Sequence, residues 1–305
     1  CRLVRQCFVD SYSNTHCRTS RQWHIKNEVL TLDMYSSSTF ERAVMTSPQS
    51  TARFSDRVAD YVRYRPGYPP ETLDVLRDAV GLTSHSVVAD IGSGTGISTE
   101  LLLRSGAEVY GVEPNDPMRA AAEAQLSANT RFRSVRGTAE ATTLADGSVD
   151  IIAAAQAFHW FDRDRTRAEF TRILRPGGYV VLLWNSRHVD TTPLLRGYEA
   201  ILQQYATDYN AVNHQNIDAA AVSRFYAPGS CTRVVLPNSQ SFDFAGLRGR
   251  LLSSSYAPSA GDPRHEPMLA VLKQLFDEHA TAGTSAEKVA RFDYDTEIYY
   301  GRLNS

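Results

Sequence analysis

The chain has 305 residues, enough to bury one large hydrophobic core and a small additional layer. Its 32 lysines and arginines nearly balance 34 acidic residues, for a formal charge of −2, which argues against the basic face that nucleic acids and anionic membranes require. No apolar run approaches the ~20 residues of a membrane-spanning helix. We therefore expect neither a nucleic acid nor a membrane as partner, and the sequence does not indicate the oligomeric state.

The beginning of the chain differs from the rest. Residues 1–50 lack sustained hydrophobic periodicity, so we expect an irregular extension ahead of one domain over residues 51–305. The extension is either an upstream translated segment or a targeting segment, since acidic residues are few before Glu28. We favour the first interpretation, because Met45 begins an ordinary lead-in to the domain, and we expect residues 1–44 to be dispensable.

The cysteines are distributed unevenly along the chain. Three of the four lie within the first 17 residues, and only Cys231 lies in the predicted domain. No disulfide framework can therefore hold the domain, which suits a reducing compartment, and we expect a cytoplasmic protein. The spacing of the first three cysteines matches no familiar zinc motif, so we expect no metal site.

Residues 54–69 form an entry segment with the sequence FSDRVADYVRYRPGYP. The segment carries Tyr61 and Arg65 ahead of the first predicted strand. These two side chains either cap the edge of a sheet or close over a bound ligand, where an arginine suits a carboxylate.

Residues 87–96, with the sequence VVADIGSGTG, are the most informative part of the chain. Mostly apolar residues predict a buried parallel strand, which Asp90 closes. A tight turn follows at Gly92, Gly94 and Gly96, and a helix begins after it. Glycine accepts positive φ and lets the backbone approach a ligand, while the first N–H groups of the helix stay available. The pattern predicts a nucleotide-binding loop at the carboxyl end of a strand. A chance glycine-rich turn is the alternative.

The spacing of the glycines distinguishes between nucleotides. A dinucleotide fingerprint requires a small residue at position 97, and this chain has Ile97 there. Asp90 before the loop and the bare N–H groups within it, including that of Ser93, instead suit a ligand that carries an ammonium and a carboxylate.

A second strand is predicted over residues 107–112, and Glu113 follows it. Glu113 lies 21 residues after Gly92, close to the ~20-residue offset at which an acid reaches ribose hydroxyls in Rossmann-like sheets. Pro114 comes next, and a helix with proline near its first turn then carries Met118. Met118 either contacts the ligand or packs in the core.

Two further strands are predicted over residues 132–136 and 149–154, separated by a turn. The first of them runs into Ala139 and Glu140. Glu140 is either a ligand-binding residue or a solvated loop acid.

Residues 155–162, with the sequence AQAFHWFD, follow a strand and therefore lie on the ligand side of the sheet. They include Gln156 and His159. The ordinary pKa of a histidine suits base catalysis at neutral pH, but His159 could instead pack beside the neighbouring tryptophan. A helix over residues 163–174, a stop at RPGG and a strand over residues 179–185 come next.

The last third of the chain contains no nucleotide motif. Two amphipathic helices and two strands are predicted there, over residues 191–205, 266–280, 234–236 and 291–299. The strands would complete a mixed seven-stranded sheet with helices on both faces. A helical insertion at about 190–230, together with residues 244–256, would form a small cap over the mouth of the site.

The motifs within residues 87–185 resemble, in order, those of class I S-adenosylmethionine (SAM) methyltransferases with a type-11 methyltransferase domain. The entry segment and the QAFHWF box are similar to a bacterial and fungal subgroup that includes trans-aconitate methyltransferase-like proteins. The resemblance covers roughly residues 52–305 and implies an α/β, Rossmann-like fold and SAM as cofactor. Ala145 stands where the family often has proline, a small departure.

The resemblance also implies roles for individual residues. The amino-acid end of SAM would lie on Asp90 and the glycine loop, with Arg65 pairing with its carboxylate. Glu113 would hold the ribose, and the adenine would lie against Met118 and Glu140. The full predicted set of cofactor-binding residues is Tyr61, Arg65, Asp90, Gly92, Ser93, Gly94, Gly96, Glu113, Pro114, Met118, Ala139, Glu140 and Gln156.

We predict that the chain transfers a methyl group from SAM to a small-molecule acceptor, with His159 as the candidate base. The subgroup resemblance favours a carboxylic acid as acceptor, and a carboxylate would need no base. Two alternatives remain. One is a SAM-binding module without turnover. The other is a nicotinamide-dependent oxidoreductase, which shares Glu113 but is disfavoured by Ile97.

Overall fold

A computed structural model describes residues 28–29, 58–207, 209, 219–283 and 287–303. The predicted extension over residues 1–50 therefore lies outside the described residues, apart from a two-residue strand, β1 (Glu28–Val29). β1 pairs antiparallel with a strand at the edge of the sheet, and the irregular extension stays a prediction for the rest of residues 1–50.

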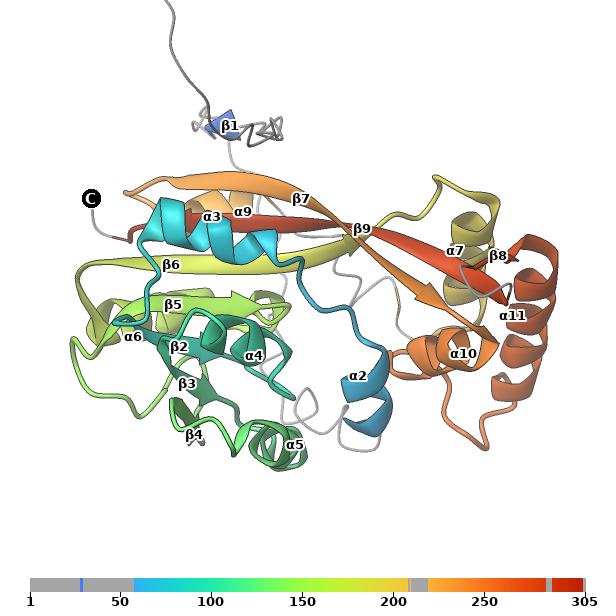
Figure 1. The fold of residues 1–305 in the computed structure, drawn as a ribbon, viewed down its shortest axis with the longest axis horizontal. Helices are drawn as coiled ribbons and strands as arrows, with labels where there is room; N and C mark the ends of the chain where they lie inside the picture. The colour runs from blue at the N-terminus through green and yellow to red at the C-terminus, as the bar shows by residue number, and fades with distance from the viewer. Residues whose placement is uncertain (1–27, 30–57, 208, 210–218, 284–286, 304–305) are drawn as a thin grey trace, which may run out of the picture.

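A mixed sheet forms the centre of the molecule (Figure 1). Its longer strands are β2 (Val87–Ile91), β3 (Glu108–Val112), β4 (Phe132–Val135), β5 (Val149–Ala155), β6 (Leu174–Arg187), β7 (Cys231–Phe242) and β9 (Lys288–Gly301). They lie in the order β7-β9-β6-β5-β2-β3-β4, with β1 beside β7 and β8 (Thr281–Ala282) beside β9. The pairs from β4 to β6 are parallel, whereas β9 is antiparallel to both of its long neighbours. The prediction of a mixed sheet with seven substantial strands is confirmed.

The order of the strands reverses at β2. The chain runs from β2 to β3 and β4 on one side, and then to β5 and β6 on the other. The connections that leave β2 and β5 therefore diverge and open a crevice beyond the carboxyl ends of these strands, where open α/β sheets bind ligands. This topology brings the loop over residues 92–96 and the segment over residues 156–162 to one edge of the sheet.

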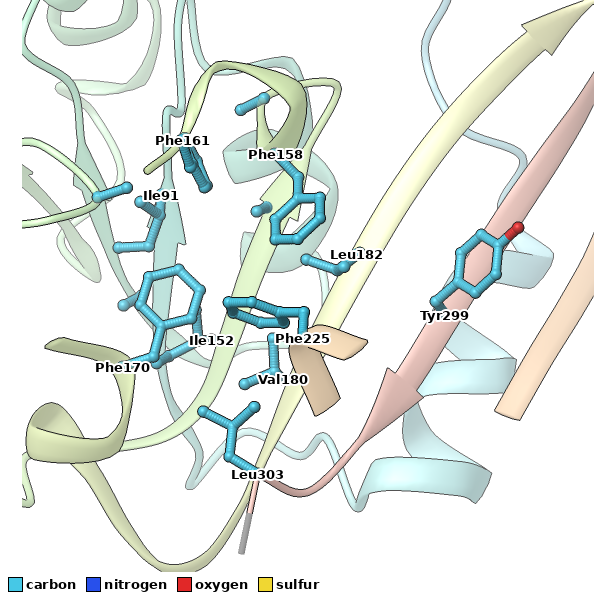
Figure 2. Packing of buried hydrophobic residues seen from close by; sticks show 14 of the residues in the cluster. Ile91, Ile152, Phe158, Phe161, Phe170, Val180, Leu182, Phe225, Tyr299 and Leu303 are labelled. Carbon is cyan, nitrogen blue, oxygen red and sulfur yellow. The ribbon is translucent and has the colours of Figure 1, made fainter. Parts of the chain in front are cut away.

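The parallel strands are buried on both faces, which explains their nearly continuous apolar sequence. Val88 and Ala89, neighbours in β2, each have no exposed surface although they point to opposite faces. One face packs against an aromatic cluster, in which the rings of Phe158 and Phe225 meet edge to face with centroids 4.8 Å apart (Figure 2). This packing fixes the 3-10 helix η2 (Phe158–Trp160) under the end of β5.

Helices cover both faces of the sheet. α3 (Glu71–Val80), α4 (Ile97–Leu103) and α5 (Asp116–Leu126) contribute Leu76, Leu102 and Leu126 to the core on one face. α6 (Arg163–Ile173) and α9 (Ala219–Tyr226) contribute Phe170 and Phe225 to the core on the other. Of the helices in the described residues, none is long and apolar enough to cross a bilayer.

The strands β7 and β9 extend beyond the parallel strands into a second group of helices, which we call the cap (Figure 1). The cap consists of α7 (Pro193–Tyr205), α10 (Phe244–Leu252) and α11 (His265–His279), which pack around Phe292 and Tyr294 of β9. α2 (Val58–Tyr64) contacts α10 and joins the entry segment to the cap.

The predicted helical insertion at about 190–230 does not form one unit. α7 packs in the cap through the face that the sequence pattern indicates, whereas α9 packs Val222 and Phe225 against the sheet. Apolar periodicity identifies both helices, but it cannot indicate which of two apolar surfaces each will cover. The cap instead combines α7 with α10 and α11.

Three strands are longer than predicted. β7 and β9 pair with each other continuously from Cys231–Gly301 to Phe242–Ala290, so each continues through residues without apolar alternation. β6 begins at Leu174 rather than at residue 179. Leu174 pairs with Val149, and the register then shifts at the predicted stop, where Gly177 has φ of 79°.

Candidate functional site

The glycine-rich loop leaves β2 with three alternate glycines in the left-handed region. Gly92, Gly94 and Gly96 have φ of 69°, 57° and 91°. A Cβ at Gly92 would lie 2.7 Å from the Cβ of Ala157, and a Cβ at Gly96 would lie 2.9 Å from Cδ1 of Leu126. These two positions are therefore closed by the packing of the protein itself.

Gly94 is different because it faces open space. The nearest atom to a Cβ at this position would be Sδ of Met118, at an ordinary contact distance of 3.9 Å. The backbone at Gly94 thus forms a cradle that any side chain would fill, and its exposed face is available to a ligand.

Asp90, in β2, has no solvent exposure. Its Oδ2 accepts hydrogen bonds from Ser98 Oγ at 2.7 Å and Thr99 Oγ1 at 2.6 Å, both in α4. Burial raises the pKa of Asp90 to about 6, although these two bonds oppose the rise. Its Oδ1 is buried and has no hydrogen-bond partner within the described part of the chain. An unsatisfied carboxylate oxygen behind the loop suits a cationic donor.

Glu113 follows β3 and is 7% exposed. Its Oε2 accepts the N–H of Gly94 at 2.9 Å, and its Oε1 accepts the N–H of Asn115 at 2.8 Å. Burial raises the pKa of this carboxyl, and the two backbone bonds partly offset that rise. Because each carboxylate oxygen has a second lone pair, Glu113 can orient the loop and still accept from ribose hydroxyls.

The residues predicted to surround the adenine lie on the α5 side of the loop. Met118 is 5% exposed, in the first turn of α5, and the half-buried Pro114 precedes that helix. Ala139 is part of the core. Glu140 is not a solvated acid, because its Oε1 accepts the N–H of Asp162 at 2.9 Å just before α6. Glu140 therefore joins its own segment to the segment that follows β5.

A pocket enclosing about 540 Å³, part of it open to solvent, lies over the glycine loop. Its lining residues come from the entry segment, the loop, the ends of β5 and β6, and the cap: Tyr61, Arg65, Pro66, Tyr68, Gly92, Ser93, Gly94, Thr95, Ile97, Ser98, Ala155, Gln156, Asn185 and Arg250. The pocket unites six predicted residues, namely Tyr61, Arg65, Gly92, Ser93, Gly94 and Gln156. Its lining does not include the predicted residues Asp90, Gly96 and Glu113, nor His159 and the residues predicted for the adenine.

Arg65 follows α2 and enters the pocket from the entry segment. Its Nη2 donates to the carbonyl of Ser253 at 3.0 Å, and its guanidinium carbon lies 4.8 Å from the centroid of the Tyr61 ring. Its Nε is buried without a hydrogen-bond acceptor in the described residues. Burial and the positive charge of Arg250 both lower the pKa of Arg65. This environment favours an incoming anion.

Gln156 stands directly after β5 with φ of 56°, a left-handed conformation that is uncommon for a residue with a side chain. Its N–H donates to Leu183 O at 2.9 Å, and its Nε2 donates to Asn185 O at 3.3 Å. Such conformations cost roughly 1–3 kcal/mol and cluster at ligand sites. The structure thus supports the placement of Gln156 on the ligand side.

Sequence reasoning missed five polar residues of the pocket, namely Tyr68, Thr95, Ser98, Asn185 and Arg250. Asn185 accepts from Thr296 Oγ1 at 2.5 Å and donates to Gly67 O at 3.0 Å, so it fixes the segment that carries Tyr68. Tyr68 and Asn185 both lie in segments that the motifs had singled out, and the end of a strand was a usable signal for Asn185. Arg250 had no local signal, because its place in the pocket follows from the packing of the cap.

His159 does not have the properties predicted for a base. It lies in η2, with its ring centroid 4.8 Å from that of Trp160 and the planes tilted by 45°. Burial lowers the pKa of His159 to about 4, well below the value near 6.5 expected from sequence. A histidine with this pKa is neutral and weakly basic at pH 7, so packing beside the tryptophan describes it better.

The comparisons with known proteins concern the part of the chain that carries these features. Residues 89–182 match the family model of a methyltransferase domain. An uncharacterized methyltransferase of Mycobacterium tuberculosis is 41% identical over 134 residues, which are 44% of this chain and 52% of the relative. An uncharacterized methyltransferase-like protein of Schizosaccharomyces pombe is 34% identical over 156 residues, 51% of this chain and 59% of the relative. The matches thus span little more than half the length of these curated relatives.

A solved structure supports the fold over a longer stretch. A candidate type II methyltransferase from Anaeromyxobacter dehalogenans matches with a TM-score of 0.57 and 22% identity, covering 79% of this chain and 98% of that protein. At this identity the likeness is informative about architecture. The chain has the Rossmann-like fold of class I methyltransferases, as its motifs and strand pattern predict.

Proposed function

We propose that this chain is a SAM-dependent methyltransferase that acts on a small-molecule acceptor. The observation that carries the proposal is the open cradle at Gly94, whose N–H donates to the buried carboxyl group of Glu113, in the loop that follows the buried Asp90. The match of residues 89–182 to a methyltransferase domain supports the same function. The position of Ile97 argues against a dinucleotide, whose pyrophosphate requires close helix packing at that point.

The charges of the site fit the amino-acid end of SAM. Asp90 Oδ1 is a buried acceptor without a partner in the described residues, which suits the ammonium. The Nε of Arg65 is a buried donor without an acceptor in the described residues, which suits the carboxylate of SAM. Glu113 accepts the N–H of Gly94 in the loop, and its remaining lone pairs can accept hydrogen bonds from ribose hydroxyls. These residues would hold the cofactor through groups that the fold itself leaves unsatisfied.

When bound, SAM supplies an activated methyl group on a sulfonium sulfur. The protein must orient the acceptor and exclude water, and orientation alone can lower the barrier by ~7–11 kcal/mol. The Tyr61 ring and Arg65 are placed by α2 beside the loop, so the entry segment forms one wall of the site. General base catalysis typically adds only about 10²–10⁴-fold, so positioning is the larger contribution.

The acceptor we propose is a carboxylic acid. The titratable side chains that line the described pocket are tyrosines and arginines. A carboxylate is already ionised at neutral pH, and it needs no proton acceptor before it reacts. Positive charge on Arg65 and Arg250 also favours an acidic molecule in this pocket. The cysteine distribution leads us to place this activity in the cytoplasm.

Calorimetric titration tests this function directly. The full chain should bind SAM and S-adenosylhomocysteine but not NADH. Gly94→Ala should weaken the binding of S-adenosylhomocysteine, because its methyl group occupies the cradle, while the domain stays folded. Gly92→Ala and Gly96→Ala are the matched controls, and they should instead lower thermal stability because their methyl groups meet protein atoms. Binding of NADH alone, or unchanged affinity in Gly94→Ala, would contradict the proposal. Turnover on small carboxylic acids then separates an enzyme from a binding module.

A further inference from the structure

Arg250 brings a positive charge from the cap into the pocket over the glycine loop. It lies in α10, is 4% exposed, and is the residue through which the cap lines this pocket among the described residues. The other lining residues belong to the entry segment and the sheet edge. Arg250 and Arg65 therefore line one pocket from two different elements, α10 and the entry segment.

The charge of Arg250 is not neutralised within the described structure. Among the described residues no ion pair with a carboxylate is found for Arg250. Its side-chain partners there are neutral, namely Ser254 Oγ at 3.4 Å and the Tyr294 side chain. Its Nε is buried without an acceptor. A buried charge without a partner is costly, so a fold normally pairs it.

Another buried arginine, which packs against the cap, provides an internal comparison. Arg187, at the end of β6, lies over the ring of Tyr198 in α7, with 5.0 Å between its guanidinium carbon and the ring centroid. Its side chain is 8% exposed, and its Nη2 lies 2.5 Å from Oε2 of Glu199 in α7. A carboxylate of the cap thus neutralises Arg187, which does not line the pocket, whereas Arg250 lines the pocket and is left to an anion from outside.

The cofactor cannot satisfy both arginines of the pocket. SAM carries one carboxylate, and Arg65 is the better candidate for it, because Arg65 is held beside the glycine loop by Tyr61 and Ser253. The positive charge of Arg250 lowers the pKa of Arg65, so the two guanidiniums repel each other. A second anion between the cap and the loop would relieve this repulsion.

We infer that Arg250 is the specificity-determining residue for the acceptor, and that it binds a carboxylate of that molecule. This inference rests on the proposed function, because it assigns Arg65 to the cofactor and Arg250 to the acceptor. It goes further by naming the residue that selects an acidic acceptor over a neutral one.

The test uses the full chain saturated with S-adenosylhomocysteine and titrated with succinate, citrate, inorganic phosphate and the neutral succinamide. At least one carboxylate should bind the wild-type complex, and succinamide should not. Arg250→Met should weaken carboxylate binding roughly 30-fold or more, as loss of one partner of a buried charge pair does at interfaces. Arg250→Lys should restore part of the affinity, because it keeps the charge but loses the planar donor pair.

Measurements of cofactor affinity and melting temperature distinguish the role of Arg250 from that of Arg65. Arg250→Met should leave the affinity for S-adenosylhomocysteine within about threefold and the melting temperature unlowered, since it replaces an unpaired buried charge by a side chain of similar length. Arg65→Met should weaken cofactor binding. The inference fails if no carboxylate binds the wild-type complex, if phosphate alone binds, if Arg250→Met binds carboxylates as well as the wild type, or if Arg250 rather than Arg65 controls cofactor affinity. If wild-type protein binds no S-adenosylhomocysteine, the proposed function itself fails.

Discussion

At the scale of single residues, Asp90 is a buried carboxyl whose ionisation destabilises the folded protein. Its carboxyl has no exposed surface, and burial raises its pKa from 3.8 to about 6. Between these two pH values the folded protein holds a proton that the unfolded chain has released. The free energy of unfolding must therefore decrease as pH rises from about 4 to 6.

We predict that Asp90→Asn removes this loss of stability. At pH 7 the ionised Asp90 costs about 3 kcal/mol, from a pKa that rises from 3.8 to about 6. The asparagine can still accept from Ser98 and Thr99 through its carbonyl oxygen. Urea denaturation should show the variant gaining on the wild type as pH rises from 4 to 7. If the free energies of unfolding of the two proteins changed with pH in parallel, the pKa of Asp90 would not be raised.

The same carboxyl should make cofactor binding depend on pH. A ligand ammonium favours the ionised form of Asp90, so affinity for S-adenosylhomocysteine should increase as pH rises through about 6. Asp90→Asn should bind more weakly and lose this pH dependence, although it is more stable. If both proteins show the same pH profile by calorimetry, Asp90 does not face the ammonium.

His159 leads to the opposite expectation for activity. Because burial lowers its pKa to about 4, His159 is neutral throughout the range from pH 6 to 8. We predict that His159→Gln reduces turnover by less than about tenfold and leaves the pH profile between 6 and 8 unchanged. A loss of about 10²–10⁴-fold would instead show a general base. The melting temperature serves as the control for loss of the stacking on Trp160.

The residues that sequence predicts well are those whose role is local. Gly92, Gly94 and Gly96 are set by the backbone of one turn, so their spacing suffices to identify the loop. The environment of His159 is different, because its pKa depends on burial that no neighbouring residue determines. The role of Arg250 is harder still to predict from the sequence. It meets Arg65 only because the cap folds back, as the bond from Arg65 to Ser253, 188 residues away, illustrates.

At the scale of elements, the contact between α2 and α10 aligns the two arginines. Gly249 in α10 lies against the ring of Tyr64 at the end of α2, and a Cβ there would overlap that ring. The absence of a side chain at Gly249 therefore allows the entry segment to approach the cap. Arg65 follows Tyr64 directly, while Arg250 follows Gly249.

We predict that Gly249→Ala separates these helices. Alanine favours a helix over glycine by about 1 kcal/mol, but overpacking costs about 1–3 kcal/mol, so thermal stability should decrease. Affinity for S-adenosylhomocysteine should decrease as well, because displacement of α2 moves Arg65 and Tyr61. The double variant Gly249→Ala/Tyr64→Ala provides the control, since it makes room for the methyl group. Additive effects of the two substitutions would show that the contact does not align the site.

The elements themselves were predictable where one periodicity dominated. The parallel strands and α7 follow from runs of apolar residues, and α5 from its start at Asn115, whose side chain accepts the N–H of Met118. The assignment of helices to layers was not predictable. α7 and α9 are both amphipathic, yet one packs in the cap and the other against the sheet.

At the scale of the whole molecule, three hydrophobic clusters form the core of the described domain. Their buried members among the described residues lie at or after Leu76, and the cores on the two faces of the sheet meet the cap through β7 and β9. The described part of the extension touches this framework at β1, where Glu28 pairs with Arg233 and Val29 pairs with Thr232. Two paired residues at an edge contribute little, since cross-strand pairs are worth ~0.2–1 kcal/mol each.

We therefore predict that a shortened chain beginning at Met45 keeps the stability and the binding of the full chain. Loss of β1 should lower the melting temperature by no more than about 8 °C, because two cross-strand pairs are worth at most about 2 kcal/mol and each kcal/mol shifts the melting temperature of a domain of this size by ~2–4 °C. Calorimetry should give the same affinity for S-adenosylhomocysteine, because the cradle, Asp90 and Arg65 all lie beyond the cut. A substitution of Val29 by proline in the full chain isolates the pairing with β7. A large fall in melting temperature on shortening, without one in the proline variant, would mean that other residues before Met45 pack on the domain and that its boundary lies earlier.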